Sequence, residues 1–289
     1  MDRSAEKQTQ VDQKRNEIVI RYPVLWDIMI SEWKSPGEED HAWLMYSANY
    51  LLHTRGIRWA IDPLTLHWRI SRASQVDVAR DLRDLSFIIL THRHADHLDL
   101  DLVHNLRELP IQWIIPEFLL VPVVESGLSR AKIIVPKAME PLELEGIKIT
   151  PFDGLHREVD STYPDGRRGV PAIGYLMEFS GKRWLFPGDT RTFDASQLPS
   201  FGPVDGLFAH LWLGRGCALN EKPPLLDAFC SFCLELQPKR IIVTHLEEFG
   251  RTIDEYWDEE HFQPVRRQIL ERAPDRIIES AYLGKRVDL

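Results

Sequence analysis

Three features that would point away from a cytoplasmic enzyme are scarce or missing in this 289-residue sequence. Cysteine occurs only at Cys217, Cys230 and Cys233, too few for a disulfide-stabilised scaffold, which favours a reducing compartment. No run approaches 18 apolar residues, so we expect no membrane span. The first residues are polar and form no apolar stretch, so we expect no secretory signal peptide. The sequence therefore predicts a soluble, cytoplasmic protein.

Positive charge is in deficit, with 35 Lys and Arg against 44 Asp and Glu and a formal net charge of −9. Proteins that bind bulk nucleic acid or an anionic membrane surface carry basic patches, so this charge argues against both partners. One small anionic substrate in a local basic pocket stays compatible with this charge. We expect a small-molecule substrate, and the sequence leaves the oligomeric state open.

The order of polar and apolar segments predicts one α/β domain behind a short tail. Residues 1–16 mix charges without apolar periodicity, so we expect a mobile N-terminal tail. From Glu17 the chain is strand-like, and residues 17–289 are expected to form a single domain. Strands alternate with helices, one of which we expect to begin with Pro264 at its first position. This alternation predicts mixed sheets with helices on their outer faces.

The strongest motif is His92-x-His94-x-Asp96-His97. It follows the short apolar run 86–90, which is typical of a strand covered on both faces, so it lies at the carboxyl end of a buried strand. Imidazole nitrogens and carboxylate oxygens are the ligands that zinc and similar metals prefer. A chance match to this pattern in a chain with 11 histidines is roughly one in a thousand. The motif therefore predicts a metal site.

Further ligand types follow predicted strands later in the chain. His156 follows the strand 147–152, Asp189 lies in Pro-Gly-Asp-Thr after another strand, and His245 follows an apolar run. Each residue alone is more often structural, since a lone Asp before Thr is usually a turn or helix cap. Their order after the first motif makes a shared metal centre the better interpretation.

In this order the residues resemble the ligands of the metallo-β-lactamase superfamily. The resemblance runs from about residue 42 to the end and includes Asp62-Pro63 and the closing AYLGKRVDL. It implies a four-layer αββα sandwich with the site on one edge, and two divalent metal ions, zinc first and manganese second. One ion would be held by His92, His94 and His156, the other by Asp96, His97 and His245, and Asp189 would bridge both.

This ligand set implies hydrolysis by a metal-bridging hydroxide. Two cations about 3.5–4 Å apart can share one water and lower its pKa toward about 7. The hydroxide would attack a carbonyl or phosphoryl centre, and the cations would take up the charge of the oxyanion. Asp96 would orient the water and accept its proton, which makes it the expected catalytic residue.

Two finer resemblances concern the reaction. Redox di-iron members of the superfamily tend to carry Glu where this chain has His94, so His94 favours hydrolysis. The segments SANYLL and THRHADHLD look most like the branch with the ascorbate-6-phosphate lactonases and N-acyl phosphatidylethanolamine phospholipase D. The expected substrate is a small phosphoester or phosphodiester. A lactone or other carbonyl ester is the alternative, and a non-hydrolytic redox or metal-binding protein is less favoured.

Three further residues are candidates for contacts to the substrate. His210 ends a predicted strand in FAHLWLGRG and is expected to have a catalytic role, although a structural histidine under a loop is equally compatible. Arg191 lies two residues after Asp189, and Arg215 lies in a Gly-Arg-Gly turn. Together with the polar loop 157–169, these two arginines are expected to bind an anionic substrate, because Arg suits phosphate or carboxylate.

Overall fold

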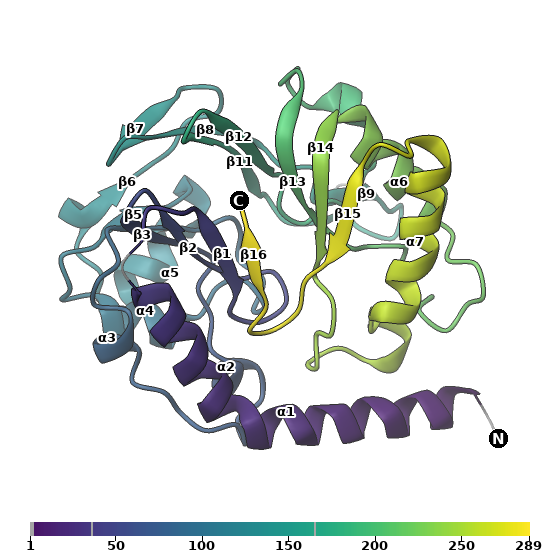
Figure 1. Cartoon of the computed structure of the whole chain (residues 1–289), viewed down its shortest axis with the longest axis horizontal. Helices are drawn as coiled ribbons and strands as arrows, with labels where there is room; N and C mark the ends of the chain where they lie inside the picture. Colours follow the sequence, from purple (N-terminus) through teal and green to yellow (C-terminus); the bar gives the residue numbers. More distant parts are fainter. Residues whose placement is uncertain (1–2, 36, 165) are drawn as a thin grey trace.

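Two seven-stranded sheets face each other, and helices cover the outer face of each sheet (Figure 1). The computed structural model describes residues 3–35, 37–164 and 166–289. The strand order is β16-β1-β2-β3-β4-β5-β6 in the first sheet and β15-β14-β13-β12-β11-β8-β7 in the second. Both sheets contain parallel and antiparallel pairs. The predicted four-layer αββα sandwich with mixed sheets is therefore confirmed.

The elements have the following bounds. The first sheet consists of β1 (His41–Leu44), β2 (Tyr50–Thr54), β3 (Ile57–Ile61), β4 (Phe87–Ile89), β5 (Gln112–Ile114), β6 (Ile133–Ile134) and β16 (Arg286–Asp288). The second consists of β7 (Leu142–Leu144), β8 (Ile147–Asp153), β11 (Ile173–Phe179), β12 (Lys182–Phe186), β13 (Val204–His210), β14 (Pro238–Thr244) and β15 (Ile277–Ser280). The helices are α1 (Arg3–Lys34), α2 (Leu66–Arg69), α3 (Val78–Asp81), α4 (Leu100–Leu106), α5 (Leu120–Glu125), α6 (Leu226–Glu235) and α7 (Glu259–Arg272).

Three apolar clusters fill the spaces between the four layers. In β4, Phe87 and Ile89 face the second sheet, whereas Ile88 packs under the helices. In β14, Ile242 faces the first sheet, and its neighbour Ile241 packs toward α6 and α7. Side chains of a strand alternate between its faces, so a strand buried on both faces must be apolar throughout. This explains why both strands are continuous apolar runs in the sequence.

The direction of the strands places their carboxyl ends at one edge. β12, β13 and β14 are parallel, and β8 runs in the same direction because β11 is antiparallel to both β8 and β12. In the other sheet, β3, β4 and β5 are parallel. Hydrogen bonds join the two sheets at this edge, from Ile173 N to Thr91 O at 3.1 Å and from His245 N to Ser47 O at 2.7 Å. Loops that leave these strands therefore meet between the sheets.

The N-terminal segment differs from the sequence interpretation. Residues 1 and 2 lie outside the described residues, but residues 3–34 form the single helix α1 instead of a tail followed by a strand. Its buried face carries Tyr22, Trp26 and Trp33, and the Trp33 indole donates to Leu52 O at 3.0 Å. Near the other end, Lys7 Nζ lies 2.6 Å from an Asp258 oxygen. Tertiary packing of large aromatic side chains thus overrides the strand-like run 18–20.

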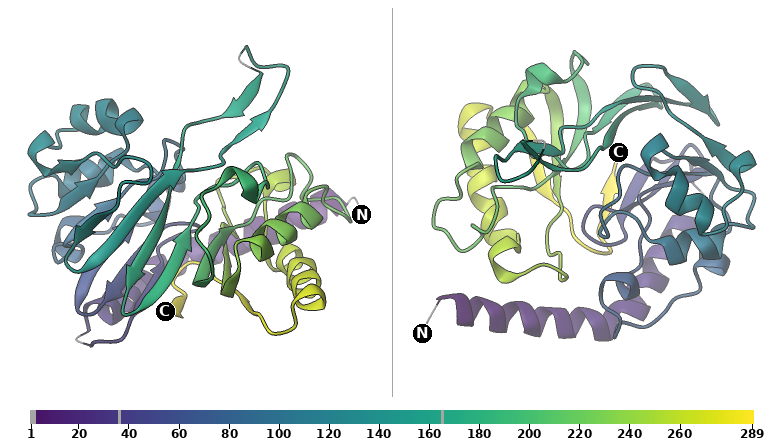
Figure 2. Two further views of the ribbon diagram at one scale, coloured as in Figure 1. Left: turned by 90° about the horizontal axis from the view of Figure 1, so that it is seen from above. Right: turned by 180° about the vertical axis from the view of Figure 1, so that it is seen from behind.

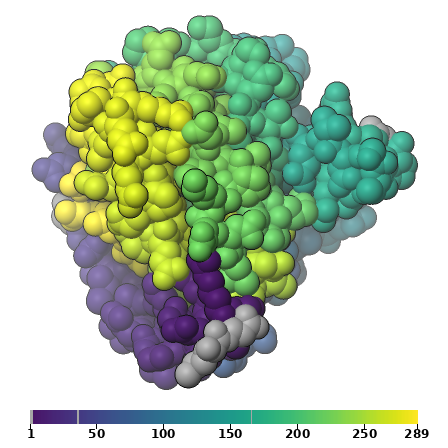
Figure 3. All heavy atoms as spheres, turned by 90° about the vertical axis from the view of Figure 1, so that its right-hand side faces the viewer, coloured from purple at the N-terminus to yellow at the C-terminus, as the bar shows by residue number. Residues whose placement is uncertain are grey.

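Two other segments refine the expected pattern. Pro264 lies inside α7 and not at its first position, because the Asp258 side chain caps this helix with a capping box that involves His261. The polar loop after His156 forms a two-stranded arm, β9 (Arg157–Val159) and β10 (Arg167–Gly169). The arm stands out from the body of the protein (Figures 2 and 3). None of the helices described here has the length and apolar character that a bilayer span requires.

Candidate metal centre

The seven residues predicted as metal ligands lie together where the carboxyl ends of both sheets meet. His92 lies three residues beyond β4, Asp189 three beyond β12, and His156 three beyond β8. His245 directly follows β14. The loop with the first motif turns sharply, because His97 N and Leu98 N both donate to His94 O at 2.9 Å. That turn directs the motif's second half toward a second point between the sheets.

The first ligand group consists of His92, His94 and His156. One ligand atom from each, together with one Asp189 oxygen, lies within 4.8 Å of all the others. His156 Nε2 is 3.1 Å from His94 Nδ1 and 3.6 Å from Asp189 Oδ2, and His92 Nε2 is 4.0 Å from the same oxygen. His92 and His156 are buried, whereas His94 is half-buried.

The second ligand group consists of Asp96, His97 and His245. With Asp189 it meets the same criterion, a ligand atom from each residue within 4.8 Å of the others. His97 Nε2 lies 3.2 Å from Asp189 Oδ1, and His245 Nε2 lies 3.3 Å from Asp96 Oδ2. Asp189 thus directs Oδ2 to the first group and Oδ1 to the second. All four side chains are buried.

The side chains present fit two metal ions. Among the described residues, buried His92 Nε2 has no hydrogen-bond partner and lies 4.0 Å from Asp189 Oδ2, and buried His97 Nε2 lies 3.2 Å from Asp189 Oδ1. Buried polar atoms without a partner are costly, and a cation between imidazole and carboxylate would satisfy them. Asp62, His92 and His97 also approach one another. There, however, an Asp62 oxygen already accepts a hydrogen bond from His97 Nδ1 at 2.7 Å.

Asp62 anchors the second ligand group from behind. Besides His97 Nδ1, its carboxylate accepts hydrogen bonds from Thr91 N at 2.7 Å and from the Thr91 hydroxyl. Asn49 Nδ2 donates to the backbone oxygens of both Asp62 and Asp96 at 2.8 Å. A carboxylate behind a ligand histidine fixes the ring and the nitrogen that stays free for the metal.

The protonation of the two groups differs. Burial lowers the pKa of His92, and burial together with His156 lowers that of His94 to about 4, so these rings are neutral at pH 7. Burial acts in the same direction on His97, but Asp189 and Asp62 outweigh it and raise its pKa well above the usual value. For Asp189, burial is outweighed by His245 and His97, which lower the pKa of its carboxyl well below the usual range.

His210 is buried beside the two ligand groups and contacts Asp189. Its Nδ1–H donates to Asp189 Oδ1 at 2.9 Å, and its Nε2 accepts a hydrogen bond from the Tyr50 hydroxyl at 2.8 Å. The Tyr50 oxygen in turn lies 2.7 Å from Thr244 Oγ1. Burial lowers the pKa of His210 to about 4, although Asp189 opposes this shift. Both ring nitrogens are thus engaged by the protein, which places His210 as a support for Asp189.

The two arginines expected at the substrate take different positions. Arg191 is buried, donates from Nη2 to Asp189 Oδ2 at 3.1 Å, and lies 3.6 Å above the Trp212 ring. Arg215 is more exposed and pairs with Glu158 of the arm and, at 3.5 Å, with Glu255. The structure therefore brings Arg191 to the metal centre, whereas Arg215 ties the base of the arm to the neighbouring loop.

Sequence reasoning missed a second arginine at the centre. Arg251 Nη2 donates to Asp96 Oδ2 at 2.9 Å, and its Nε donates to Glu248 Oε2 at 2.7 Å. The buried Glu248 also accepts a hydrogen bond from Arg69 Nη2 at 2.8 Å. Glu248 and Arg251 lie in an irregular segment without apolar periodicity, so nothing in the sequence indicates which of their charges point inward.

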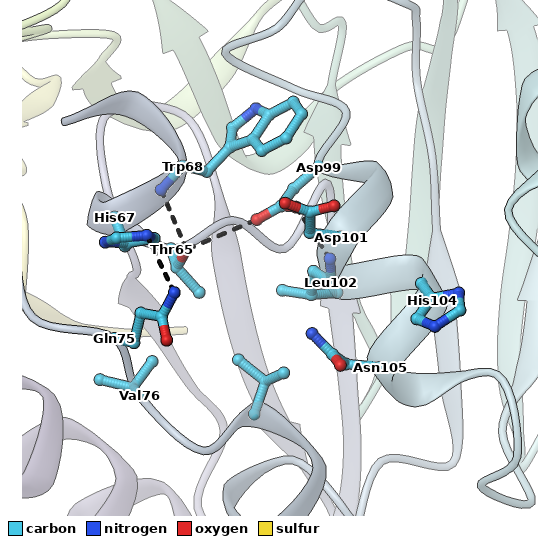
Figure 4. Close-up of a pocket in the computed structure, with 11 residues that line it drawn as sticks. Thr65, His67, Trp68, Gln75, Val76, Asp99, Asp101, Leu102, His104 and Asn105 are labelled. Carbon is cyan, nitrogen blue, oxygen red and sulfur yellow. Dashed lines mark hydrogen bonds between the residues drawn. The ribbon is translucent and has the colours of Figure 1, made fainter. Parts of the chain in front are cut away.

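A pocket of about 290 Å³ lies among the helices α2, α3 and α4 (Figure 4). Thr65, Trp68 and Asp99 line it, and none of the seven predicted ligands does. The Trp68 indole donates to Ala95 O at 2.8 Å, inside the first motif, and Asp99 accepts from Leu102 N at 2.8 Å to cap α4. These contacts hold the middle of the motif loop and the start of the helix that follows it, which gives this region a structural role.

Comparison with known proteins agrees with this architecture. A profile of the family described as "Beta-lactamase superfamily domain" matches residues 59–246. A curated relative, named a metal-dependent hydrolase from Pyrococcus abyssi, is 26% identical over 135 residues, which are 43% of this chain and 53% of the relative. The chain thus spans about half the length of that relative.

Solved structures share the fold at low sequence identity. A metallo hydrolase from the archaeon Ignicoccus hospitalis superposes with a TM-score of 0.61 at 18% identity, over 86% of this chain and 98% of that one. A diiron beta-hydroxylase from Streptomyces venezuelae gives a TM-score of 0.58 at 17% identity, over 89% of this chain and 55% of that one. The same fold thus occurs in a protein named as a hydrolase and in one named as a hydroxylase, so function must be argued from the site.

Proposed function

Because this chain belongs to the beta-lactamase superfamily domain family, we propose that it is a metal-dependent hydrolase with two divalent metal ions. The observation that carries the proposal is the position of Asp189, whose Oδ2 faces the first ligand group and whose Oδ1 faces the second. A carboxylate shared in this way holds two cations at a fixed separation. Zinc is our first expectation and manganese the second, since imidazole and carboxylate accept both.

Residues around this centre have different proposed roles, either in proton transfer or in holding a ligand in position. When bound, two divalent cations supply Lewis acidity that activates a water and stabilises an oxyanion. Asp96 is proposed as the catalytic residue: its Oδ2 is engaged by His245 and Arg251, while Oδ1 makes no hydrogen bond to the described residues and is left to accept a proton from the attacking water. His210 and Arg191 hold Asp189 from two sides.

The substrate proposed first is a small phosphoester or phosphodiester, with a lactone or other carbonyl ester as the alternative. Support for an anionic substrate comes from Arg251, which contacts the ligand Asp96 and is partly exposed, while buried Arg191 adds positive charge beside Asp189. Within the superfamily, resemblance to ascorbate-6-phosphate lactonases and N-acyl phosphatidylethanolamine phospholipase D favours these two substrate classes. A cytoplasmic location agrees with three free cysteines, all of which are buried.

Metal analysis and a substrate panel test the proposal together. Protein purified without chelator is expected to contain about two divalent ions per chain by elemental analysis, and a His92→Ala/His94→Ala variant fewer. A visible spectrum separates colourless zinc from iron redox chemistry. The panel comprises bis(p-nitrophenyl) phosphate, p-nitrophenyl phosphate, a lactone and a thioester.

Two results would contradict the proposal. One is a metal content that stays near zero after metal is added back, or that is unchanged by the double substitution. The other is full metal content with no turnover of any ester while oxygen consumption is observed. Turnover of the lactone alone would retain the hydrolase and replace the phosphoester by the carbonyl ester.

A further inference from the structure

Of the arginines that surround the metal centre, Arg251 is the one placed to meet a substrate. Arg191 is only 5% exposed at its side chain and is covered by Trp212. Arg215 is 37% exposed, but Glu158 and Glu255 already pair with it. Arg251 is 24% exposed and still contacts the ligand Asp96 directly. It therefore combines access from solvent with contact to the centre.

The guanidinium of Arg251 is fixed in orientation by buried carboxylates. Nε donates to Glu248, whose side chain is 3% exposed and is itself held by Arg69. Nη2 donates to Asp96. Nη1 makes no hydrogen bond to the described residues, and its nearest ion-pair contact is Glu255 Oε2 at 3.7 Å. Because a guanidinium has five N–H donors in a rigid fork, this arrangement leaves one edge with donors to offer.

The backbone that leads from the last ligand to Arg251 is strained. His245 and Glu247 have φ angles of 63° and 56°, the left-handed region that residues other than glycine seldom adopt. His245 N donates to Ser47 O and Glu247 N donates to Trp257 O, both at 2.7 Å, so the surroundings hold this conformation. Strain of this kind persists where the structure enforces it and clusters at functional sites. Here its effect is to bring residue 251 back onto Asp96.

The charge balance at this position favours an anion once metals are bound. Two divalent cations would bring four positive charges against the two negative charges of Asp96 and Asp189. The negative charge of Asp96 that now faces Arg251 would then be shared with a cation. The remaining carboxylate partner, Glu248, also pairs with Arg69. The mouth of the centre would therefore carry excess positive charge, which attracts anions.

We propose that Arg251 is a substrate-binding residue that grips an anionic oxygen, phosphoryl or carboxylate, of the substrate through its Nη1 edge. This inference rests on the proposed function, because it places the anion beside the bond that the metal centre would cleave. It shifts the anion-binding role from Arg215 to a residue that the sequence did not indicate. Arg191 keeps its place as a support for Asp189.

Binding of small anions to the metal-loaded protein tests this proposal without a known substrate. Inorganic phosphate and acetate are titrated by calorimetry into wild type, Arg251→Ala, Arg251→Lys and, as matched control, Arg93→Ala. Arg93 lies between two predicted ligands but is exposed and makes no hydrogen bond or ion pair with the described residues. Each variant is first checked for metal content by elemental analysis and for its melting temperature.

The expected result is a weaker anion complex in Arg251→Ala at full metal content. A hydrogen bond to a charged group contributes about 1.5–3 kcal/mol, which corresponds to a loss of roughly 10- to 150-fold. Arg251→Lys should lose less because the charge remains, and Arg93→Ala should stay within about twofold. Preference for phosphate over acetate in wild type, lost in Arg251→Ala, would identify the bound group as phosphoryl, and the reverse preference as carboxylate.

Three results would overturn the proposal. Unchanged phosphate and acetate binding in a fully loaded Arg251→Ala variant would show that the side chain does not contact the anion. Loss of metal from both Arg251 variants would make it a residue that only positions Asp96. Equal losses in Arg251→Ala and Arg93→Ala would indicate a general charge effect. In all three cases wild type still holds its metals, whereas failure of the proposed function shows as wild-type protein without metal.

Discussion

The two ligand groups that share Asp189 are supported by the protein to very different degrees. In the second group, Asp62 holds His97, Arg251 holds Asp96, and Ser47 O accepts from His245 N. In the first group, the Thr91 hydroxyl lies 3.0 Å from His92 Nδ1, and His156 Nδ1 has no hydrogen-bond partner in the part of the chain that the structure describes. His94 is half-buried, while every member of the second group is buried.

The first ligand group is thus the more accessible to solvent, and the second is the more rigidly held. In the first group, the lowered pKa values of His92 and His94 keep these two rings neutral at pH 7, and His94 is only half-buried, so a cation meets no proton on either ring. The ligands of the second group are held in position by hydrogen bonds before a metal binds. In the metal-free protein, however, Asp189 and Asp62 raise the pKa of His97, so its ring keeps a proton that must leave when a metal binds. We therefore expect the first position to be filled over a wider pH range than the second.

Removing the residue that the two groups share should have the largest effect. Asp189→Ala takes away the bridging carboxylate, so we expect metal content to fall below one ion per chain and kcat/KM to fall by about 10³-fold or more, because catalytic effects of this size follow the loss of a main stabilising group. His210→Ala removes only a support of Asp189, for which a loss of about 10–100-fold is typical.

Steady-state kinetics with metal in excess, combined with elemental analysis, measures both variants. Asp189→Asn is the control for volume, since it keeps the shape of the side chain and removes its charge. If His210→Ala cost more activity than Asp189→Ala, the bridge would be misassigned and His210 would contact the substrate.

The pH dependence of metal loading should distinguish the two groups directly. The pKa of His97 is raised above its usual value, so below that pKa each fall of one pH unit should weaken the second position about tenfold, as expected for competition with one proton. The pKa of His94 is lowered to about 4 and that of His92 well below its usual value, so neither of these two ligands of the first position meets such competition between pH 5 and 8. We expect about two ions per chain at the upper end of this range and about one at the lower end.

Equilibrium dialysis against buffered metal at several pH values, followed by elemental analysis, checks this expectation. His97→Ala should bind about one ion at every pH in the range, which makes it the control. Parallel loss of both ions as the pH falls would show that the two groups are not protonated differently.

Tyr50→Phe should produce a smaller effect that is mainly on stability. The substitution keeps the ring, which packs edge-on to Phe208 at 5.1 Å, but removes the hydroxyl that donates to His210 Nε2. A buried acceptor left without its donor costs about 1–3 kcal/mol. We expect a lower midpoint of denaturant unfolding, with metal content unchanged because Asp189 keeps its bond from His210. Loss of metal would show that the hydrogen bonds from Tyr50 through His210 are needed to hold Asp189 in its bridging position.

The metal ligands could be predicted from the sequence, because their identity depends on residue type and on position after a strand. Metal chemistry restricts ligands to a few side chains, and apolar runs such as 86–90 and 241–243 show where strands end, so residues like His92 and His245 could be placed at one sheet edge. Arg251 and Glu248 could not be predicted, because they lie in a loop whose shape depends on contacts to distant residues. Helix α1 was missed although Tyr22, Trp26 and Trp33 have helical spacing, since the run 18–20 and Pro23 favoured a broken strand.

Arg215→Ala should have the smallest effect. The sequence places Arg215 at the substrate, but in the structure it joins Glu158 of the arm to Glu255 at the surface, outside both ligand groups. Exposed ion pairs contribute about 0–1 kcal/mol, so stability should change little. Phosphate binding should stay within about twofold of wild type, in contrast to Arg251→Ala. Titration of both variants side by side decides between them: a large loss in Arg215→Ala alone would mean that the arm folds over the centre and that its arginine, not Arg251, meets the anion.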